Sequence, residues 1–138
     1  CDAVNLKGCA RWMRLQADEE RLHAMKLFDH LNARDGRVLL QALEQPPQEF
    51  KNVRELFDQT LAHEKHVTAL IHKLYETAQN EKDYATMESL RWFITEQVEE
   101  EANASEIVER LKMIGENQPA LYLLDRELGG RAAGAEEE

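Results

Sequence analysis

The chain has 138 residues, of which 43% are hydrophobic and 32% are charged, and its formal net charge is −10 with a pI of about 5.0. This length suits one compact domain covering residues 1–138, and no apolar run approaches the ~20 residues of a membrane-spanning helix. The acidic balance argues against nucleic acid as a partner, because such binding relies on Lys and Arg to neutralise phosphates. No basic segment followed by an apolar stretch opens the chain, so no secretory signal is expected. The two cysteines, Cys1 and Cys9, form no CxxC pair, which favours a reducing, cytoplasmic setting and leaves their role open.

The first predicted helix covers residues 6–33, because apolar residues recur there at steps of three and four. The apolar face is expected to consist of Met13, Ala17, Ala24, Leu27 and Leu31. Gly36 suits the end of this helix. Residues 37–52 include Pro46 and Pro47 and are predicted to be a linker.

The second predicted helix covers residues 53–80, with Asn52 as its N-cap and Glu55 three residues later. After a short turn, Asp83 is expected to cap a third long helix that ends at Gly115. Pro119 then opens a short helix that continues to residue 128, since proline is favoured in the first turn. Residues 5–128 are therefore expected to be ordered, and residues 129–138 to form a flexible tail.

The linker has a length that bears on topology. Sixteen extended residues span roughly 50 Å at ~3.3 Å each, whereas a helix of about 27 residues is about 40 Å long. The linker can therefore run the length of a bundle and leave the first two helices parallel. The short turn before Asp83 requires the third helix to run antiparallel to the second, which gives an all-α bundle with one long crossover.

Polar residues interrupt the apolar faces near the middle of each long helix. Glu20 and His23 lie three residues apart on the first helix, Glu64 interrupts the second, and Gln97 and Glu100 interrupt the third. Buried carboxylates are costly without a partner, and several together repel one another unless protons or cations neutralise them. Carboxylates with one imidazole suit iron, manganese or zinc better than calcium, so the pattern predicts a buried metal site, with two ions rather than one.

A plainer interpretation stays open for each of these residues. An isolated ExxH on a helix is a weak signal, and one glutamate at the edge of an apolar face can extend to solvent. Other candidates are weaker still. His63 and His66 are expected at the surface, His30 and His72 at solvated or boundary positions, and Trp12, Trp92 and Phe93 in packing.

Four stretches of the chain resemble helices of the prokaryotic non-haem ferritins. LKGCARWMRLQADEERLHAMKLFDHLNARDGRV is similar to their second bundle helix, LFDQTLAHEKHVTALIHKL to their third, SLRWFITEQVEEEANASEIVERLKMIGE to their fourth, and PALYLLDREL to their short fifth. The resemblance extends over nearly the whole chain from residue 5 to residue 128. It implies a ferritin-like helical bundle in a cytoplasmic subunit that oxidises Fe(II) and stores iron.

The resemblance also implies roles for single residues. Glu20 would bridge two irons of a dinuclear ferroxidase centre, His23 would bind one of them, and Glu64 would bind the other. Gln97 would hydrogen-bond water or an oxygen species nearby, and Glu100 would lie at the second iron site or beside it.

Three more glutamates match a third iron site that varies across the family: Glu19, Glu96 and Glu99. Haem-binding relatives carry Met directly after the bridging glutamate, where this chain has Arg21, so no haem is expected. The family implies a homo-oligomeric cage, usually of twenty-four subunits, with iron and dioxygen or peroxide as reactants.

One departure concerns the start of the chain. These ferritins have a long helix before the matched stretches, which supplies one more glutamate ligand, and we expect this chain to lack it. Ferroxidase activity would then be impaired. The alternative function is a non-catalytic helical fragment that binds metal weakly or pairs with the missing helix. A di-iron enzyme acting on an organic substrate is a third possibility, although no feature marks a substrate pocket and the fifth-helix segment argues against it.

Overall fold

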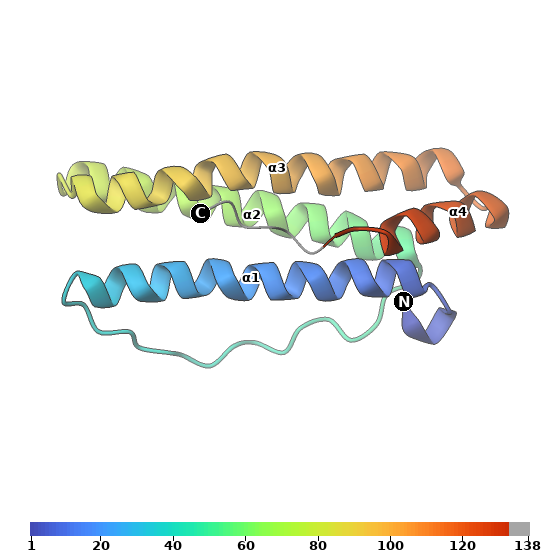
Figure 1. Ribbon diagram of the computed structural model, residues 1–138, viewed down its shortest axis with the longest axis horizontal. Helices are drawn as coiled ribbons and strands as arrows, with labels where there is room; N and C mark the ends of the chain where they lie inside the picture. The colour runs from blue at the N-terminus through green and yellow to red at the C-terminus, as the bar shows by residue number, and fades with distance from the viewer. Residues whose placement is uncertain (133–138) are drawn as a thin grey trace. The chain divides into compact units, whose positions relative to one another are not determined.

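The computed structural model describes residues 1–132, and no described residue lies in a strand. The elements are the 3-10 helix η1 (Asp2–Val4) and the helices α1 (Lys7–Ala33), α2 (Val53–Asn80), α3 (Tyr84–Ile114) and α4 (Gln118–Gly129) (Figure 1). Three long helices and one short helix were predicted, and the structure confirms them. Residues 37–52 form no helix, in agreement with the predicted long connection. Within the described range, no helix combines the length and apolar character needed to cross a membrane.

The helices fall into two compact units. The first contains residues 1–43 together with the segment from Ile114 onward, and therefore holds α1 and α4. The second contains Glu44–Met113, and therefore holds α2 and α3. The expectation of a single domain over residues 1–138 stays a prediction.

In the α2–α3 unit, local capping fixes where each helix begins. The Asn52 side chain accepts a hydrogen bond from the Glu55 backbone N–H at 2.9 Å, and Glu55 accepts one from the Lys51 N–H at 2.6 Å. Asp83 accepts from the Thr86 backbone N–H at 3.1 Å. Both predicted caps are thus confirmed, and each satisfies backbone donors that the helix itself leaves free.

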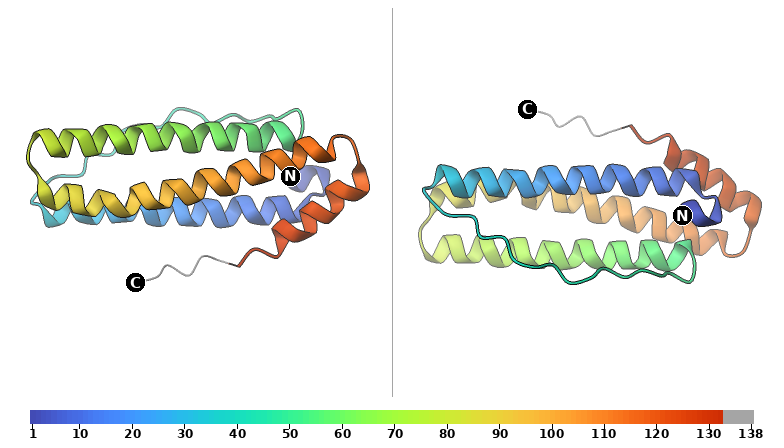
Figure 2. Two further views of the ribbon diagram at one scale, coloured as in Figure 1. Left: turned by 90° about the horizontal axis from the view of Figure 1, so that it is seen from above. Right: turned by 90° about the horizontal axis from the view of Figure 1, so that it is seen from below.

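A short turn joins α2 to α3. Lys82 adopts a left-handed conformation (φ 58°), and the Asp83 N–H donates to the Ala78 carbonyl at 2.9 Å. A connection of this length makes the two helices antiparallel neighbours, as both views in Figure 2 show.

The C-terminus of α1 differs from the prediction in detail. The residue with positive φ is Asp35 (57°), not Gly36, and the Gly36 N–H donates to the Leu31 carbonyl at 2.9 Å. Glycine suits position 36 for space, because a Cβ there would lie 2.8 Å from the Leu31 backbone carbonyl oxygen. Gly115, by contrast, ends α3 with a φ of 56°, as a left-handed glycine after a helix does.

In the α1–α4 unit, α4 packs against the N-terminal part of α1. A Cβ on Gly8 would overlap the backbone carbonyl of Asp125, and a Cβ on Gly129 would lie 3.1 Å from the Gly8 Cα. The two glycines therefore permit an approach of backbone to backbone. The Asp125 carboxylate accepts a hydrogen bond from the Cys9 N–H at 2.8 Å, so α4 supplies an acceptor for a free N–H in the first turn of α1.

This contact also determines the chemistry of Cys9. Burial raises the pKa of the Cys9 thiol from 9.0 to about 12, and a hydrogen bond to the Asp125 carboxylate and its negative charge act in the same direction. The folded chain thus keeps the proton between pH 9 and 12, where an unfolded chain loses it. The contribution of Cys9 to the free energy of unfolding is therefore fully present below pH 9, and it is lost as the pH rises towards 12.

We therefore expect Cys9 to resist alkylation in the folded protein. Only a thiolate reacts readily, so iodoacetamide at pH 9–10 should modify Cys1, which is partly exposed, and leave Cys9 unmodified. Peptide mass spectrometry with and without urea measures the difference. Equal modification of both cysteines without urea would contradict the assigned environment, and Cys1→Ser provides the control for the identity of the reacting thiol.

The buried face of α1 is not the predicted one. Ala17 and Ala24 are exposed, and Leu31 is 41% exposed. The helix instead buries a face that begins at its glycine-containing first turns and includes polar residues: Gly8, Cys9, Trp12, Gln16 and His23. On α2, α3 and α4, most apolar residues that recur at steps of three and four are buried or half-buried, although Leu74 of α2 is exposed.

The segment expected to be a flexible tail, residues 129–138, is only partly described. Gly129 is the last residue of α4, and Arg131 contacts α1 through its guanidinium. Residues 133–138 lie outside the described residues.

Candidate metal centre

The α2–α3 unit buries two carboxylates and one amide in its apolar core. Glu64, Gln97 and Glu100 are 3%, 4% and 5% exposed. On α2 the buried positions recur every seven residues, as Phe57, Glu64, Ile71 and Ala78. On α3 they alternate in steps of three and four, as Leu90, Phe93, Gln97, Glu100, Ala104, Ile107 and Leu111. The helix packing that buries the apolar residues therefore buries these polar groups as well.

The Gln97 amide is held by α2. Its Nε2 donates to the Glu64 backbone carbonyl at 3.2 Å and to the Thr68 hydroxyl oxygen at 3.3 Å, and lies 3.4 Å from Glu64 Oε2. Each of these contacts involves the amide nitrogen. Among the described residues, none donates to its oxygen, so the Gln97 carbonyl oxygen is available as an acceptor.

A second polar contact supports the first. The Thr68 hydroxyl lies 2.6 Å from Glu101 Oε1 and 3.0 Å from the Glu64 carbonyl. A hydroxyl has one proton to donate, and the shorter contact to a carboxylate is the stronger one. Thr68 therefore accepts from Gln97 and donates to Glu101, which fixes the amide orientation.

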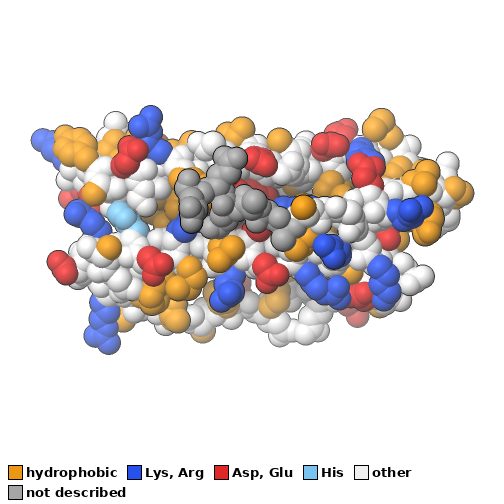
Figure 3. Space-filling view, viewed as in Figure 1, with side chains coloured by type: hydrophobic (Ala, Val, Ile, Leu, Met, Phe, Trp, Pro, Cys, Tyr) orange, Lys and Arg blue, Asp and Glu red, His pale blue; other side chains and the backbone are white. Residues whose placement is uncertain are grey.

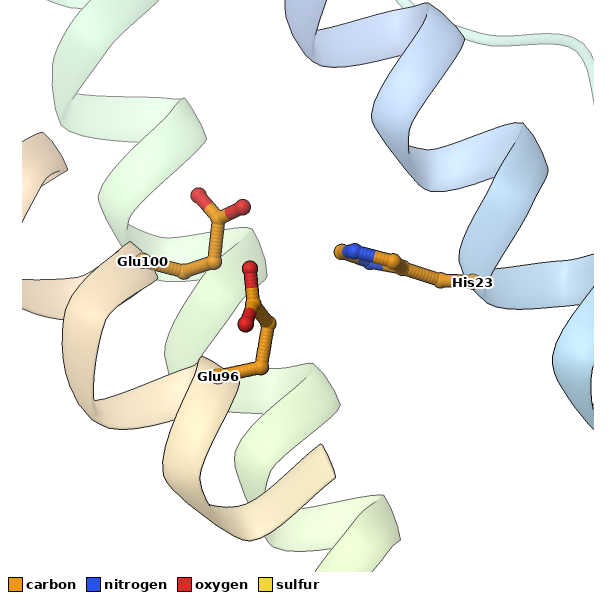
Figure 4. A group of neighbouring side chains, drawn as sticks. All are labelled: His23, Glu96 and Glu100. Carbon is orange, nitrogen blue, oxygen red and sulfur yellow. The ribbon is translucent and has the colours of Figure 1, made fainter. Parts of the chain in front are cut away.

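The other two glutamates of α3 differ in exposure. Glu96 is half-buried and Glu99 is exposed. Glu96 and Glu100 are four residues apart, so they project from one side of the helix on successive turns, as Figure 4 shows. Glu99 lies off that side, consistent with its solvent exposure.

In the α1–α4 unit, His23 and Glu20 lie together. His23 is 8% exposed, and its Nδ1 lies 3.6 Å from Glu20 Oε2. Glu20 is less buried, with a side chain 37% exposed. The three-residue spacing thus brings an imidazole and a carboxylate to one face of α1, as predicted.

Glu19 has a partner that the sequence did not reveal. Arg131 Nη2 lies 2.6 Å from Glu19 Oε2, and Nη1 donates to Gln16 Oε1 at 3.1 Å. The same guanidinium lies over the Trp12 ring, 4.9 Å from its centroid. No sequence signal pointed to Arg131, which lies in the glycine- and alanine-rich segment interpreted as a tail.

The remaining histidines fit the sequence-based expectation. His63, His66 and His72 are exposed and His30 is half-buried. Of the described histidines, His23 alone is buried. The buried donors of the α2–α3 unit are carboxylate oxygens, and the buried donor of α1 is an imidazole. Each kind of donor suits iron or other first-row divalent ions.

Acidic residues are not collected into one patch on the face shown in Figure 3. Red acidic and blue basic side chains are interspersed there with apolar ones. Acidic side chains are thus scattered over that face, whereas Glu64 and Glu100 are buried. Among the described residues, every buried side-chain nitrogen or oxygen atom has a hydrogen-bond partner.

Comparison with known proteins places these residues in a family. The ferritin-like domain matches residues 1–114, which is most of the chain. The chain belongs to the ferritin family. It is 39% identical to a bacterial non-heme ferritin of Staphylococcus epidermidis over 132 residues, which are 96% of this chain and 80% of that protein.

Solved ferritin structures have the same fold. An open-pore ferritin from the hyperthermophilic archaeon Archaeoglobus fulgidus is 50% identical, with a TM-score of 0.94, covering 95% of this chain and 81% of that one. An engineered closed form of the Archaeoglobus fulgidus ferritin is 49% identical, also with a TM-score of 0.94, covering 96% and 81%. The predicted ferritin-like, all-α bundle is therefore confirmed.

Proposed function

We propose that this ferritin stores iron, and that it oxidises Fe(II) at a dinuclear carboxylate–histidine centre before mineralisation. The observation that carries the proposal is the burial of Glu64, Glu100 and His23, each at most 8% exposed, at the middle of long helices. Carboxylate oxygens and an imidazole nitrogen are donors that suit a first-row divalent ion. Fe(II) as substrate is such an ion.

In this proposal Glu20 bridges two irons, His23 binds one, and Glu64 binds the second, with Glu100 at the second site or beside it. Mixed oxygen and imidazole donors favour such an ion over calcium. The 3.6 Å between Glu20 Oε2 and His23 Nδ1 supports this assignment, because one ion could contact both atoms.

The proposed reaction moves two electrons. Two Fe(II) ions become two Fe(III) ions, and dioxygen with two protons becomes hydrogen peroxide. When peroxide is the oxidant, it takes two electrons and two protons and yields two waters. The protein's part is to hold two ions close together in a largely dry interior.

Gln97 is proposed to act on the oxygen species rather than on iron. Its nitrogen donates to the Glu64 carbonyl and the Thr68 hydroxyl, which leaves the carbonyl oxygen to act as an acceptor. It would accept a hydrogen bond from water or from protonated, reduced oxygen. Thr68 and Glu101 hold it in this orientation.

The assembly proposed is a homo-oligomeric cage, of twenty-four subunits as in the family, in the cytoplasm and without haem. The third iron site at Glu19, Glu96 and Glu99 stays a prediction as well. Membership of the family and the buried donors favour iron storage over the alternative of a non-catalytic helical fragment.

Native mass spectrometry before and after aerobic addition of Fe(II) tests this function. We expect a large oligomer that gains many irons per subunit. The control is the same protein with Fe(II) under anaerobic conditions, where only ions bound at protein sites should remain. A monomer or small oligomer that takes up no iron would instead support the fragment alternative.

A further inference from the structure

We propose that Arg131 is a latch that occupies the Glu19 carboxylate and so excludes a third metal ion from it. The inference rests on the proposed iron function, because Glu19 matches a third iron site only through the family resemblance. In the resting state Glu19 pairs with the guanidinium in place of a metal ion.

The guanidinium of Arg131 makes three different contacts with α1. One nitrogen pairs with Glu19 at 2.6 Å, the other donates to Gln16 at 3.1 Å, and the plane lies over Trp12. The partners are spaced at three and four residues, so they form one continuous row along α1. The side chains of Arg131 and Glu19 are only 23% and 17% exposed, which limits screening of the pair by water and salt.

The position of Arg131 follows from the packing of α4. Gly129 approaches the Gly8 Cα, and Asp125 accepts the hydrogen bond from Cys9. Arg131 comes two residues after the end of α4 at Gly129, so little chain separates it from these anchors. The guanidinium therefore reaches the row on α1 at a small cost in chain entropy.

A metal ion and Arg131 compete for Glu19. Oε2 is taken by the guanidinium, and the positive charge nearby disfavours a second cation at the same carboxylate. A third ion therefore requires the latch to open.

Equilibrium dialysis against Zn(II), with metal counted per subunit, tests the latch without any turnover. Arg131→Gln should bind one more Zn(II) per subunit than the native protein, and adding Glu19→Gln should abolish the gain. Glu19→Gln alone should leave the native stoichiometry unchanged, because Glu19 is already occupied. Arg126→Gln is the matched control on exposed α4 surface and should change nothing.

Two results would overturn the latch while leaving the dinuclear centre intact. In the first, Arg131→Gln binds the same number of Zn(II) ions per subunit as the native protein, and replacing His23 lowers that number. The other is a loss of bound Zn(II) in Glu19→Gln alone, which is a conservative variant that does not depend on the packing of Arg131. Absence of Zn(II) from every variant, with the native protein included, would instead remove the proposed function and the latch together.

Discussion

His23→Ala is expected to abolish rapid Fe(II) oxidation. The variant loses the one buried imidazole among the described residues, and with it a proposed iron ligand. The initial rate should fall by more than the roughly 10–100-fold typical of losing an outer-shell partner alone. Stopped-flow absorbance of the Fe(III) product measures the rate, and anaerobic Fe(II) titration measures binding, which should fall as well.

His63→Ala is the matched control, since it removes an exposed imidazole that directly precedes Glu64. Its rate should equal that of the native protein. Gln97→Leu separates the binding of iron from the binding of the oxygen species. It should lower the oxidation rate and leave the number of bound Fe(II) ions unchanged. A native rate in His23→Ala would refute the assignment of the centre.

Gly8→Ala is expected to lower the free energy of unfolding by about 3 kcal/mol or more. In an ordinary helix interior the same change stabilises by roughly 1 kcal/mol. Here the new methyl group would overlap the Asp125 backbone carbonyl, so α4 must move away from α1. Urea unfolding gives the free energy, and hydrogen exchange should show loss of protection in α4.

Gly129→Ala offers a graded comparison at the same contact. Its Cβ would lie 3.1 Å from the Gly8 Cα, which a small shift of α4 relieves, so the loss of stability should be smaller. If Gly8→Ala were as stable as the native protein, the close packing of α4 on α1 would be wrong.

Much of the fold could be predicted because its signals are local. Asn52 and Asp83 cap the helices that directly follow them, and the seven-residue recurrence of buried positions on α2 is visible in the sequence. The face of α1 was assigned wrongly for a physical reason. Apolar residues that are 38–41% exposed lie on several sides of this helix (Leu22, Met25, Phe28 and Leu31), while polar Gln16 is buried.

In the candidate site, too, local features could be predicted and tertiary contacts could not. Glu64, Gln97 and Glu100 could be identified because a polar residue within an apolar series is a local signal, and their burial is confirmed. The partners Thr68, Glu101 and Arg131 could not, because their contacts join residues that are 29 or more positions apart. Such pairings depend on tertiary packing, for which one sequence gives no direct signal.

The hydrogen bond from Cys9 to Asp125 has a consequence for the order in which this chain acquires structure. No side chain next to α1 caps its N-terminus, and the acceptor that does so lies 116 positions later. During synthesis the first turn of α1 therefore lacks this acceptor until Asp125 has left the ribosome. Closing so large a loop carries an entropic cost that local contacts do not. The first turn of α1 is thus expected to become rigid later than the turns that local contacts hold.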